Sequence, residues 1–400
     1  MSQITTRTRS RSDEQITTPA VLYRGGTSKA FIVQSKDLPS QDRARIAEWV
    51  LAIYGSPDKR QIDGVGGADG LTSKFAIVGP PSRADADIDY TFAQVGITEA
   101  SVDWNLICGN ISAAIGPFVI DEGLVEAVGP TTTVRVHNTN TGKLIECVVQ
   151  VEQGRAKVIG TTHIDGVPGT AAPILLDFRD SASTKGKGLL PTGNVRDSID
   201  VPGFGTVEYS LVDAALPGLF LAAKRFGLTG HEGPLELEAN TAAMASIDSV
   251  RRTVAFHLGW ATSAEAASTE VPHTPAAILV SGPAPWTEFG SKVMHEASDC
   301  DCTVRAVGAR AVHKAFMVTG SVATGIAASL PGSVLHDVTR PEAHERGAYR
   351  LAHPSGIIET VVALERSGSE ILLRRAAIVR TARRLLDGVV YASRARLAWA

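Results

Sequence analysis

The sequence predicts an α/β (α+β) fold with two similar domains, each a curved sheet that encloses a central helix. The chain has 400 residues, and chains beyond roughly 250–300 residues generally divide into two or more domains. Short strand-like and helix-like patterns alternate along it, interrupted by 38 glycines. Two helix patterns rich in small residues lie one in each half, at 111–123 and 312–332. Small side chains let other backbone approach such a helix from every side, so a sheet can close around it.

In the first half, the patterns predict four strands, a helix and a hairpin. Residues 18–33 read as strand, tight turn and strand. Residues 41–55 carry apolar side chains at helical spacing and end at Gly55, which is suited to a C-terminal cap. Residues 73–79 and 87–97 alternate like strands, and residues 131–154 read as a hairpin that turns at NTNTG.

In the second half, a long loop precedes further strands and helices. Residues 179–194, RDSASTKGKGLLPTGN, have the composition of a linker or a functional loop. Residues 248–261 are predicted to be helical, and residues 276–282 form a strand pattern. The apolar stretches at 356–365 and 371–392 close the chain.

The composition excludes several classes of partner. The net charge of −3 provides no basic excess for a nucleic acid or an anionic membrane surface. Four cysteines make no disulfide framework, and no run of 18 apolar residues predicts a membrane span. The N-terminal MSQITTRTRSRSDEQ lacks the apolar core of a secretory signal, so residues 1–18 are predicted to be a disordered tail and the location to be cytoplasmic.

Two glycine-rich segments in the first half could carry chemistry. In YRGGTSKAF, Gly25 and Gly26 permit a tight turn close to a ligand, and Arg24, Thr27 and Ser28 could donate to a carboxylate or phosphate. The alternative is a plain hairpin turn. In QIDGVGGADGLTSKFAIV, Lys74 opens an apolar strand. Partial burial of an amine disfavours its charged form and suits a general base, whereas a solvated edge-strand lysine is the alternative.

A third candidate is Cys108-Gly109-Asn110, which interrupts an apolar run just before a small-residue helix. The free amides at a helix start bind anions and favour a thiolate, and Gly109 lets a ligand come close to them. A buried structural cysteine is the alternative. In the second half, Lys185, Lys187, Lys314 and Ser355 could complete a pocket for a polyanion, although each is also typical of a solvated loop. A lone Cys300-x-Cys302 without a second ligand cluster predicts no metal site.

Taken together, these motifs resemble those of the PrpF family. Along the chain they read RGGTSK, GSPD, QIDGVGG, TSKFAIV, FAQVG, VDW and CGN, and later GKGLLPTGN, HKAFMVTGSVATGIAASLPG and AHPSG. The family includes 2-methylaconitate cis-trans isomerase, 4-oxalomesaconate tautomerases and methylitaconate delta-isomerase. The resemblance extends from about residue 19 to the end of the chain.

The resemblance implies a diaminopimelate-epimerase-like fold, with two pseudo-symmetric and mostly antiparallel domains and the active site between them. The first domain is expected at 19–185 and the second at 186–374, with a segment from about 375 to 400 returning to the first. A homodimer is also expected. The chain departs from the family pattern at Leu216, where many relatives have asparagine, and at Lys314, where they often have histidine.

The resemblance further implies catalytic roles for Lys74 and Cys108, and no metal, nucleotide or pyridoxal cofactor. The substrate-binding residues are expected to come from both halves: Arg24, Gly26, Thr27, Ser28, Gly109, Asn110, Lys185, Thr192, Lys314 and Ser355. The expected function is a cofactor-independent isomerase that moves a proton and a double bond in a small unsaturated di- or tricarboxylate. The alternatives are an amino-acid racemase or epimerase on the same fold, and a non-catalytic polycarboxylate-binding accessory protein.

Overall fold

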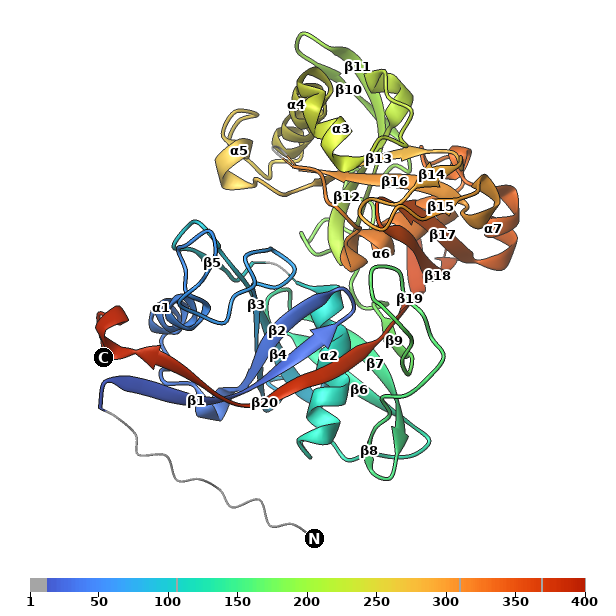
Figure 1. Ribbon diagram of the computed structural model, residues 1–400. Helices are drawn as coiled ribbons and strands as arrows, with labels where there is room; N and C mark the ends of the chain where they lie inside the picture. Colours follow the sequence, from blue (N-terminus) through green and yellow to red (C-terminus); the bar gives the residue numbers. More distant parts are fainter. Residues whose placement is uncertain (1–12, 106, 309–310, 368–369, 400) are drawn as a thin grey trace.

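The computed structural model describes residues 13–105, 107–308, 311–367 and 370–399. It consists of two halves, and each gathers its strands around one helix (Figure 1). Most of the predicted disordered tail, residues 1–12, lies outside the described residues. The rest of that prediction is wrong, because strand β1 begins at Gln15 and pairs there with the C-terminal strand β20, Gln15 facing Ser393.

The first half contains one sheet, in which the strands pair in the order β20–β1–β2–β3–β4–β6–β7–β9. The bounds are β1 Gln15–Gly25, β2 Ser28–Gln34, α1 Arg43–Tyr54, β3 Lys74–Gly79, β4 Ile88–Val95, β5 Val102–Asp103, α2 Gly109–Asp121, β6 Thr131–Asn138, β7 Lys143–Glu152, β8 Arg155–Ala156, β9 Ile174–Asp177 and β20 Ala382–Ser393.

The second half pairs its strands in the order β10–β11–β12–β13–β16–β17–β18–β19. The bounds are β10 Asp197–Val201, β11 Gly205–Ala214, β12 Leu216–Ala222, α3 Pro234–Ala239, α4 Thr241–His257, α5 Ala267–Glu270, β13 Ala276–Ser281, β14 Trp286–Thr287, β15 Met294–His295, β16 Cys302–Val307, α6 Val318–Ser329, α7 Pro341–Arg346, β17 Ala348–His353, β18 Gly356–Ser367 and β19 Glu370–Arg380.

The two sheets follow the same sequence of pairings, which makes the halves pseudo-symmetric. From β1 to β9 the successive pairs are antiparallel, parallel, antiparallel, parallel, antiparallel and antiparallel. From β11 to β19 the order is identical. In both halves a helix lies between the strands of each parallel pair, as such crossovers require. The predicted α/β fold is thereby confirmed.

Strand β19 joins the halves, because it pairs with β18 on one side and with β9 on the other. The chain then returns to the first sheet through β20, which pairs along the whole of β1 (Figure 1). This connectivity supports the expected division near residues 185 and 375. The division itself stays a prediction.

The central helices α2 and α6 are buried along almost their whole length, as their small residues predict. A Cβ on Gly116 of α2 would lie 2.5 Å from the Cys147 sulfur of β7, so the sheet closes directly on the helix backbone. The two helices also meet at their N-terminal ends, since a Cβ on Gly109 would lie 2.4 Å from Val318 Cγ1. Helix α6 spans Val318–Ser329 and is therefore shorter than the predicted 312–332, of which residues 312–317 precede the helix.

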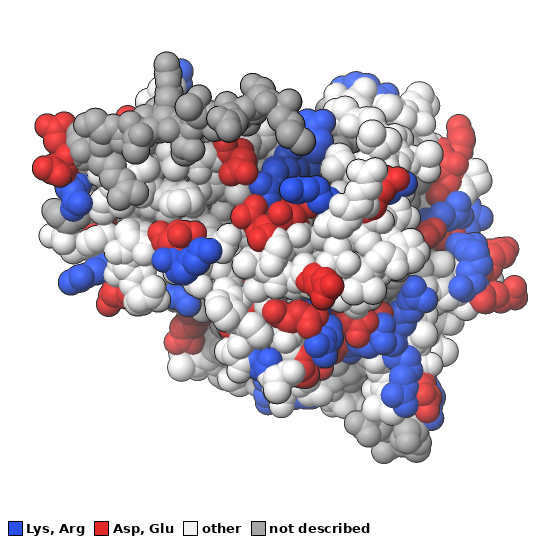
Figure 2. Space-filling view, turned by 90° about the horizontal axis from the view of Figure 1, so that it is seen from below, with Lys and Arg blue, Asp and Glu red and all other residues white. Residues whose placement is uncertain are grey.

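The outer helices α1 and α4 cover the other faces of the sheets. Helix α1 matches its prediction: Asp42 caps its first turn, and Gly55 closes it in the left-handed conformation. Helix α4 begins at Thr241, seven residues before the predicted start. Within the described residues, the helices fall short of the length and apolar character that crossing a bilayer would need. On the face shown in Figure 2, acidic and basic side chains are interspersed.

Candidate active site

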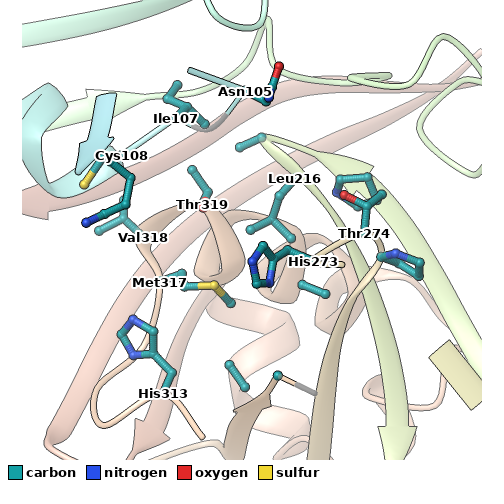
Figure 3. A pocket seen from close by; sticks show the side chains of 18 of the residues that line it. Asn105, Ile107, Cys108, Leu216, His273, Thr274, His313, Met317, Val318 and Thr319 are labelled. Carbon is teal, nitrogen blue, oxygen red and sulfur yellow. The ribbon is translucent and has the colours of Figure 1, made fainter. Parts of the chain in front are cut away.

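A cavity of about 570 Å³ lies between the two halves, at the N-terminal ends of α2 and α6 (Figure 3). Among the described residues, its wall contains Lys74, Lys185 and Arg251 but no aspartate or glutamate. Residues that line the cavity include Ser28, Lys74, Gln94, Cys108, Gly109, Asn110, Thr184, Lys185, Leu216, Arg251, His273, His313, Met317 and Thr319. Such a wall suits an anionic ligand, because the local charge is positive although the whole chain is weakly acidic.

Lys74 is held in the cavity wall by its cross-strand neighbour. It is the first residue of β3 and directly faces Gln94 of β4 in the antiparallel register. Its Nζ donates to Gln94 Oε1 at 2.6 Å. Gln94 is itself fixed, because its Nε2 donates to the carbonyls of Gly70 and Ser73. The Lys74 residue is 8% exposed and lines the cavity, unlike the solvated edge lysine of the alternative.

Cys108 is the N-cap residue of α2, and its side chain makes no capping hydrogen bond. It is half-buried and lines the cavity, whereas Cys147, Cys300 and Cys302 are buried away from it. Gly109 and Asn110 follow in the first turn, where backbone N–H groups have no partner within the helix. This arrangement places a thiol and a helix N-terminus in the same wall, as predicted.

The RGGTS turn supports helix α2 instead of approaching a ligand through its glycines. Gly26 has a φ of +50°, and a Cβ there would lie 2.1 Å from Asn110 Oδ1. Thr27 Oγ1 accepts a hydrogen bond from Asn110 Nδ2 at 3.0 Å. Arg24 is turned away from the cavity, since it donates to the carbonyls of Gly26 and Thr381. Of the five residues of this turn, Ser28 lies in the cavity wall.

The second half contributes the opposite wall. Met317 is the N-cap of α6 and therefore occupies the place that Cys108 has on α2. In Figure 3 Cys108 lies near Val318 at the start of α6, where Met317 and Thr319 also line the cavity. Leu216, the residue at which the chain departs from the family pattern, also lies in this wall. The start of α6 therefore presents an apolar side chain where the start of α2 presents a thiol.

Three second-half residues predicted to bind substrate lie outside the cavity wall. Thr192 bonds with Asn194 in an exposed turn. The Ser355 hydroxyl donates a hydrogen bond to the backbone carbonyl of Lys314, and this bond links the two segments. Direct contact with a ligand in this cavity is therefore not supported for them. Lys185 does line the cavity.

Sequence reasoning missed Gln94, His273, His313 and Arg251 as cavity residues. His313 Nδ1 accepts a hydrogen bond from the Ala315 amide at 3.1 Å, so a neutral ring carries its hydrogen on Nε2. Burial lowers the pKa of His313, and the charge of Lys74 lowers it further. Arg251 is buried and paired with Asp248 at 2.8 Å. Two of them stand in family motifs, Gln94 in FAQVG and His313 in HKAFMVTG.

The arrangement of two sheet-wrapped helices that meet at an inter-domain cavity is an epimerase-like fold. The crystal structure of a hydroxyproline epimerase from Agrobacterium vitis has the same fold, with a TM-score of 0.53, 11% identity and coverage of 96% of this chain and 94% of its own. A crystal structure of methylitaconate-delta-isomerase is much more similar. It superposes with a TM-score of 0.84 at 42% identity, covering 97% of this chain and 99% of its own.

Sequence comparisons agree with this likeness. The family model described as PrpF protein matches residues 15–393. The 3-methylitaconate isomerase of Eubacterium barkeri is 43% identical over 96% of this chain and 99% of its own length. The 4-oxalomesaconate tautomerase of Pseudomonas putida is 37% identical over 93% and 95%, and the 2-methyl-aconitate isomerase of Cupriavidus necator is 36% identical over 94% and 97%. The chain therefore belongs to the PrpF family.

Proposed function

We propose that this chain is a cofactor-independent isomerase that moves a proton and a double bond in a small unsaturated di- or tricarboxylate. The observation that carries the proposal is the cavity wall, which among the described residues contains Lys74, Lys185 and Arg251 and no aspartate or glutamate. Arg251 is already paired with Asp248, but Lys185 makes no ion pair among the described residues, and an uncharged metabolite would leave it without a partner. The names of the three isomerases and tautomerases found by sequence comparison indicate that they act on acids of this kind.

The first step is removal of a proton by Lys74 from the carbon allylic to the double bond. A neutral amine can donate one N–H to Gln94 Oε1 and still direct its lone pair at the substrate. The low exposure of the Lys74 residue limits competition from water for that position. The electron pair left on the substrate spreads over the double bond into a carboxylate, as a dienolate.

The second requirement is stabilisation of the charge that develops on that carboxylate. The backbone N–H groups at the start of α2, at Gly109 and Asn110, face the cavity with the positive end of the helix dipole behind them. The Asn110 side chain is held by Thr27, so the turn of residues 24–28 keeps this helix end in place. Ser28 provides a further hydroxyl in the wall.

The last step returns a proton to the substrate. Return to the far carbon shifts the double bond, whereas rotation followed by return to the same carbon exchanges cis and trans isomers. We propose that Cys108 acts as an acid or base on the other face of the substrate, or that it positions the substrate. We propose that His313, whose neutral ring presents Nε2–H, donates to the substrate beside Lys74.

A racemase mechanism with two facing thiols receives no support from the second half, because Met317 stands where the second thiol would be. A non-catalytic binding role would use the same cations, but it gives no reason for an amine fixed by Gln94. The homodimer and the cytoplasmic location expected from the sequence stay predictions.

The test is turnover of a panel of acids by the purified chain, followed by proton NMR. The panel contains 2-methylaconitate, cis- and trans-aconitate, 4-oxalomesaconate and methylitaconate, each incubated separately. Appearance of a double-bond isomer from one of them would support the proposal and identify the substrate. Tight binding of these acids without turnover of any would favour the binding role. If the chain neither bound nor turned over any of them, the proposed substrate class would be refuted.

A further inference from the structure

The loop at 183–188 brings a lysine to the cavity from outside the two central helices. Thr184 and Lys185 lie in the cavity wall, on the chain between β9 and β10. The Lys185 side chain is exposed, and the glycine that follows it, Gly186, has a φ of +73°. A lysine in a glycine-rich loop has many accessible positions, so something must hold this loop if Lys185 is to act at one place.

The loop is held by Asp213, a carboxylate on β11 that is 0% exposed. One carboxylate oxygen accepts the Lys185 amide at 2.7 Å, and the other accepts the Thr184 hydroxyl. The backbone of Asp213 adds two bonds, since it accepts the Ser183 amide at 2.8 Å and donates to the Leu189 carbonyl at 2.9 Å. Asp213 therefore ties both ends of the loop to the sheet.

A carboxylate is a costly group for a purely structural role at this position. Burial raises the pKa of the Asp213 carboxyl, and the hydrogen bonds from Thr184 and Lys185 offset only part of that effect. Among the described residues, no side-chain nitrogen of lysine, arginine or histidine lies within 4.0 Å of the Asp213 carboxylate oxygens. A buried charge without an ion-pair partner destabilises a fold unless its hydrogen bonds compensate.

The other cations of the wall differ from Lys185 in position or in charge balance. Lys74 is buried against Gln94, and Arg251 is already paired with Asp248 at 2.8 Å. Lys185 makes no ion pair among the described residues and is the exposed cation of the three. It therefore suits a carboxylate that extends away from the reacting carbon.

We propose that Asp213 is a positioning residue that fixes Lys185 at the rim of the cavity, and that Lys185 there binds an additional carboxylate, so that the pair selects tricarboxylates over dicarboxylates. The inference rests on the proposed function, because it assumes that the acid binds beside Lys74. Asp213 acts through Lys185 and does not itself contact the substrate.

The test compares the binding of two matched acids by isothermal titration calorimetry. Trans-aconitate carries a carboxymethyl group where mesaconate carries a methyl group, so the pair differs by one carboxylate. The readout is the ratio of the two dissociation constants, which a general loss of folding would not change selectively. The variants are Lys185→Met, Asp213→Asn, their combination, and Lys187→Met as the matched control, since Lys187 is exposed in the same loop outside the wall.

The wild type and Lys187→Met are expected to prefer trans-aconitate by about ten- to thirtyfold, the size of one charge-assisted hydrogen bond. Lys185→Met and Asp213→Asn should each reduce that preference to a few-fold, and the double variant should be no worse than Lys185→Met alone. Thr184→Val, which removes one donor to Asp213, replaces Asp213→Asn if the latter does not fold. Lys185→Arg should retain most of the preference.

Three outcomes separate the claims. An unchanged ratio in Lys185→Met would overturn the inference while leaving the proposed function intact. An unchanged ratio in Asp213→Asn or Thr184→Val, or additive losses in the double variant, would remove Asp213 as the positioning residue. Failure of the wild type to bind either acid at millimolar concentration would count against the proposed function itself.

Discussion

Replacement of Gln94 by glutamate tests whether Lys74 acts as a base whose state is set by its neighbour. The substitution keeps the shape of the side chain and puts a carboxylate 2.6 Å from Nζ in place of a neutral amide oxygen. The surroundings are poorly solvated, because Lys74 is 8% exposed. A carboxylate at this distance stabilises the ammonium form, which cannot accept a proton from the substrate.

The magnitude follows from the effect of one opposite charge at close range, which favours the charged form of a neighbouring group by about ten- to a thousandfold. We therefore expect Gln94→Glu to lower kcat near neutral pH by about a hundredfold, with recovery as the pH is raised. The assay is the initial rate of isomerisation, measured by NMR from pH 6 to pH 10 on the acid that the wild type turns over.

Gln94→Leu is the matched control, because it removes the acceptor without adding a charge. It should lower the rate through loss of positioning but leave the shape of the pH–rate profile unchanged. A Gln94→Glu profile that superposes on that of the wild type would refute the reasoning, since the charge would then have no access to the catalytic base.

Two further predictions concern stability. A methyl group at Gly109 would lie 2.4 Å from Val318 Cγ1 where the central helices meet. Gly109→Ala should therefore lower the free energy of unfolding, measured in urea, by about 1–3 kcal/mol, and Val318→Ala in the same chain should restore part of it. An unchanged free energy of unfolding in Gly109→Ala would contradict the close contact. Burial lowers the pKa of His353 well below 6.5, so the unfolded chain binds more protons below pH 6.5 and stability should fall on acidification. His353→Phe keeps an aromatic ring against Phe316, and its stability should fall less than that of the wild type between pH 7 and pH 5. An equal fall in the two proteins would contradict the role of His353 in this acid destabilisation.

The elements that could be predicted from the sequence are those whose pattern is local. The spacing of Ile46, Trp49, Val50 and Ile53 and the cap at Gly55 define α1 without reference to any other part of the chain. The burial of α2 follows from its small residues for the same reason. The prediction placed the start of α4 too late, because its first two turns, TAAMASI, are weakly periodic. The signal that marks the true start is its N-cap, Asn240.

The site could be predicted only where its residues stand in a contiguous motif. Cys108, Gly109 and Asn110 form one string, and they lie together in the wall. Gln94 reaches Lys74 through the register of β3 on β4, which no local pattern discloses. Arg24 was misjudged because the direction of its side chain depends on Thr381, more than three hundred residues further along the chain.

The central claim is that Lys74 removes a proton from an allylic carbon, and isotope incorporation tests it most directly. The wild type, Lys74→Ala and Lys29→Ala, an exposed lysine on the neighbouring strand β2, would each be incubated in D₂O with the acid that the wild type turns over. The account predicts deuterium at the allylic carbon with the wild type and Lys29→Ala, and a rate lower by about 10²- to 10⁴-fold with Lys74→Ala. Isomerisation without deuterium in product or recovered substrate, or deuterium incorporation at the wild-type rate by Lys74→Ala, would contradict it.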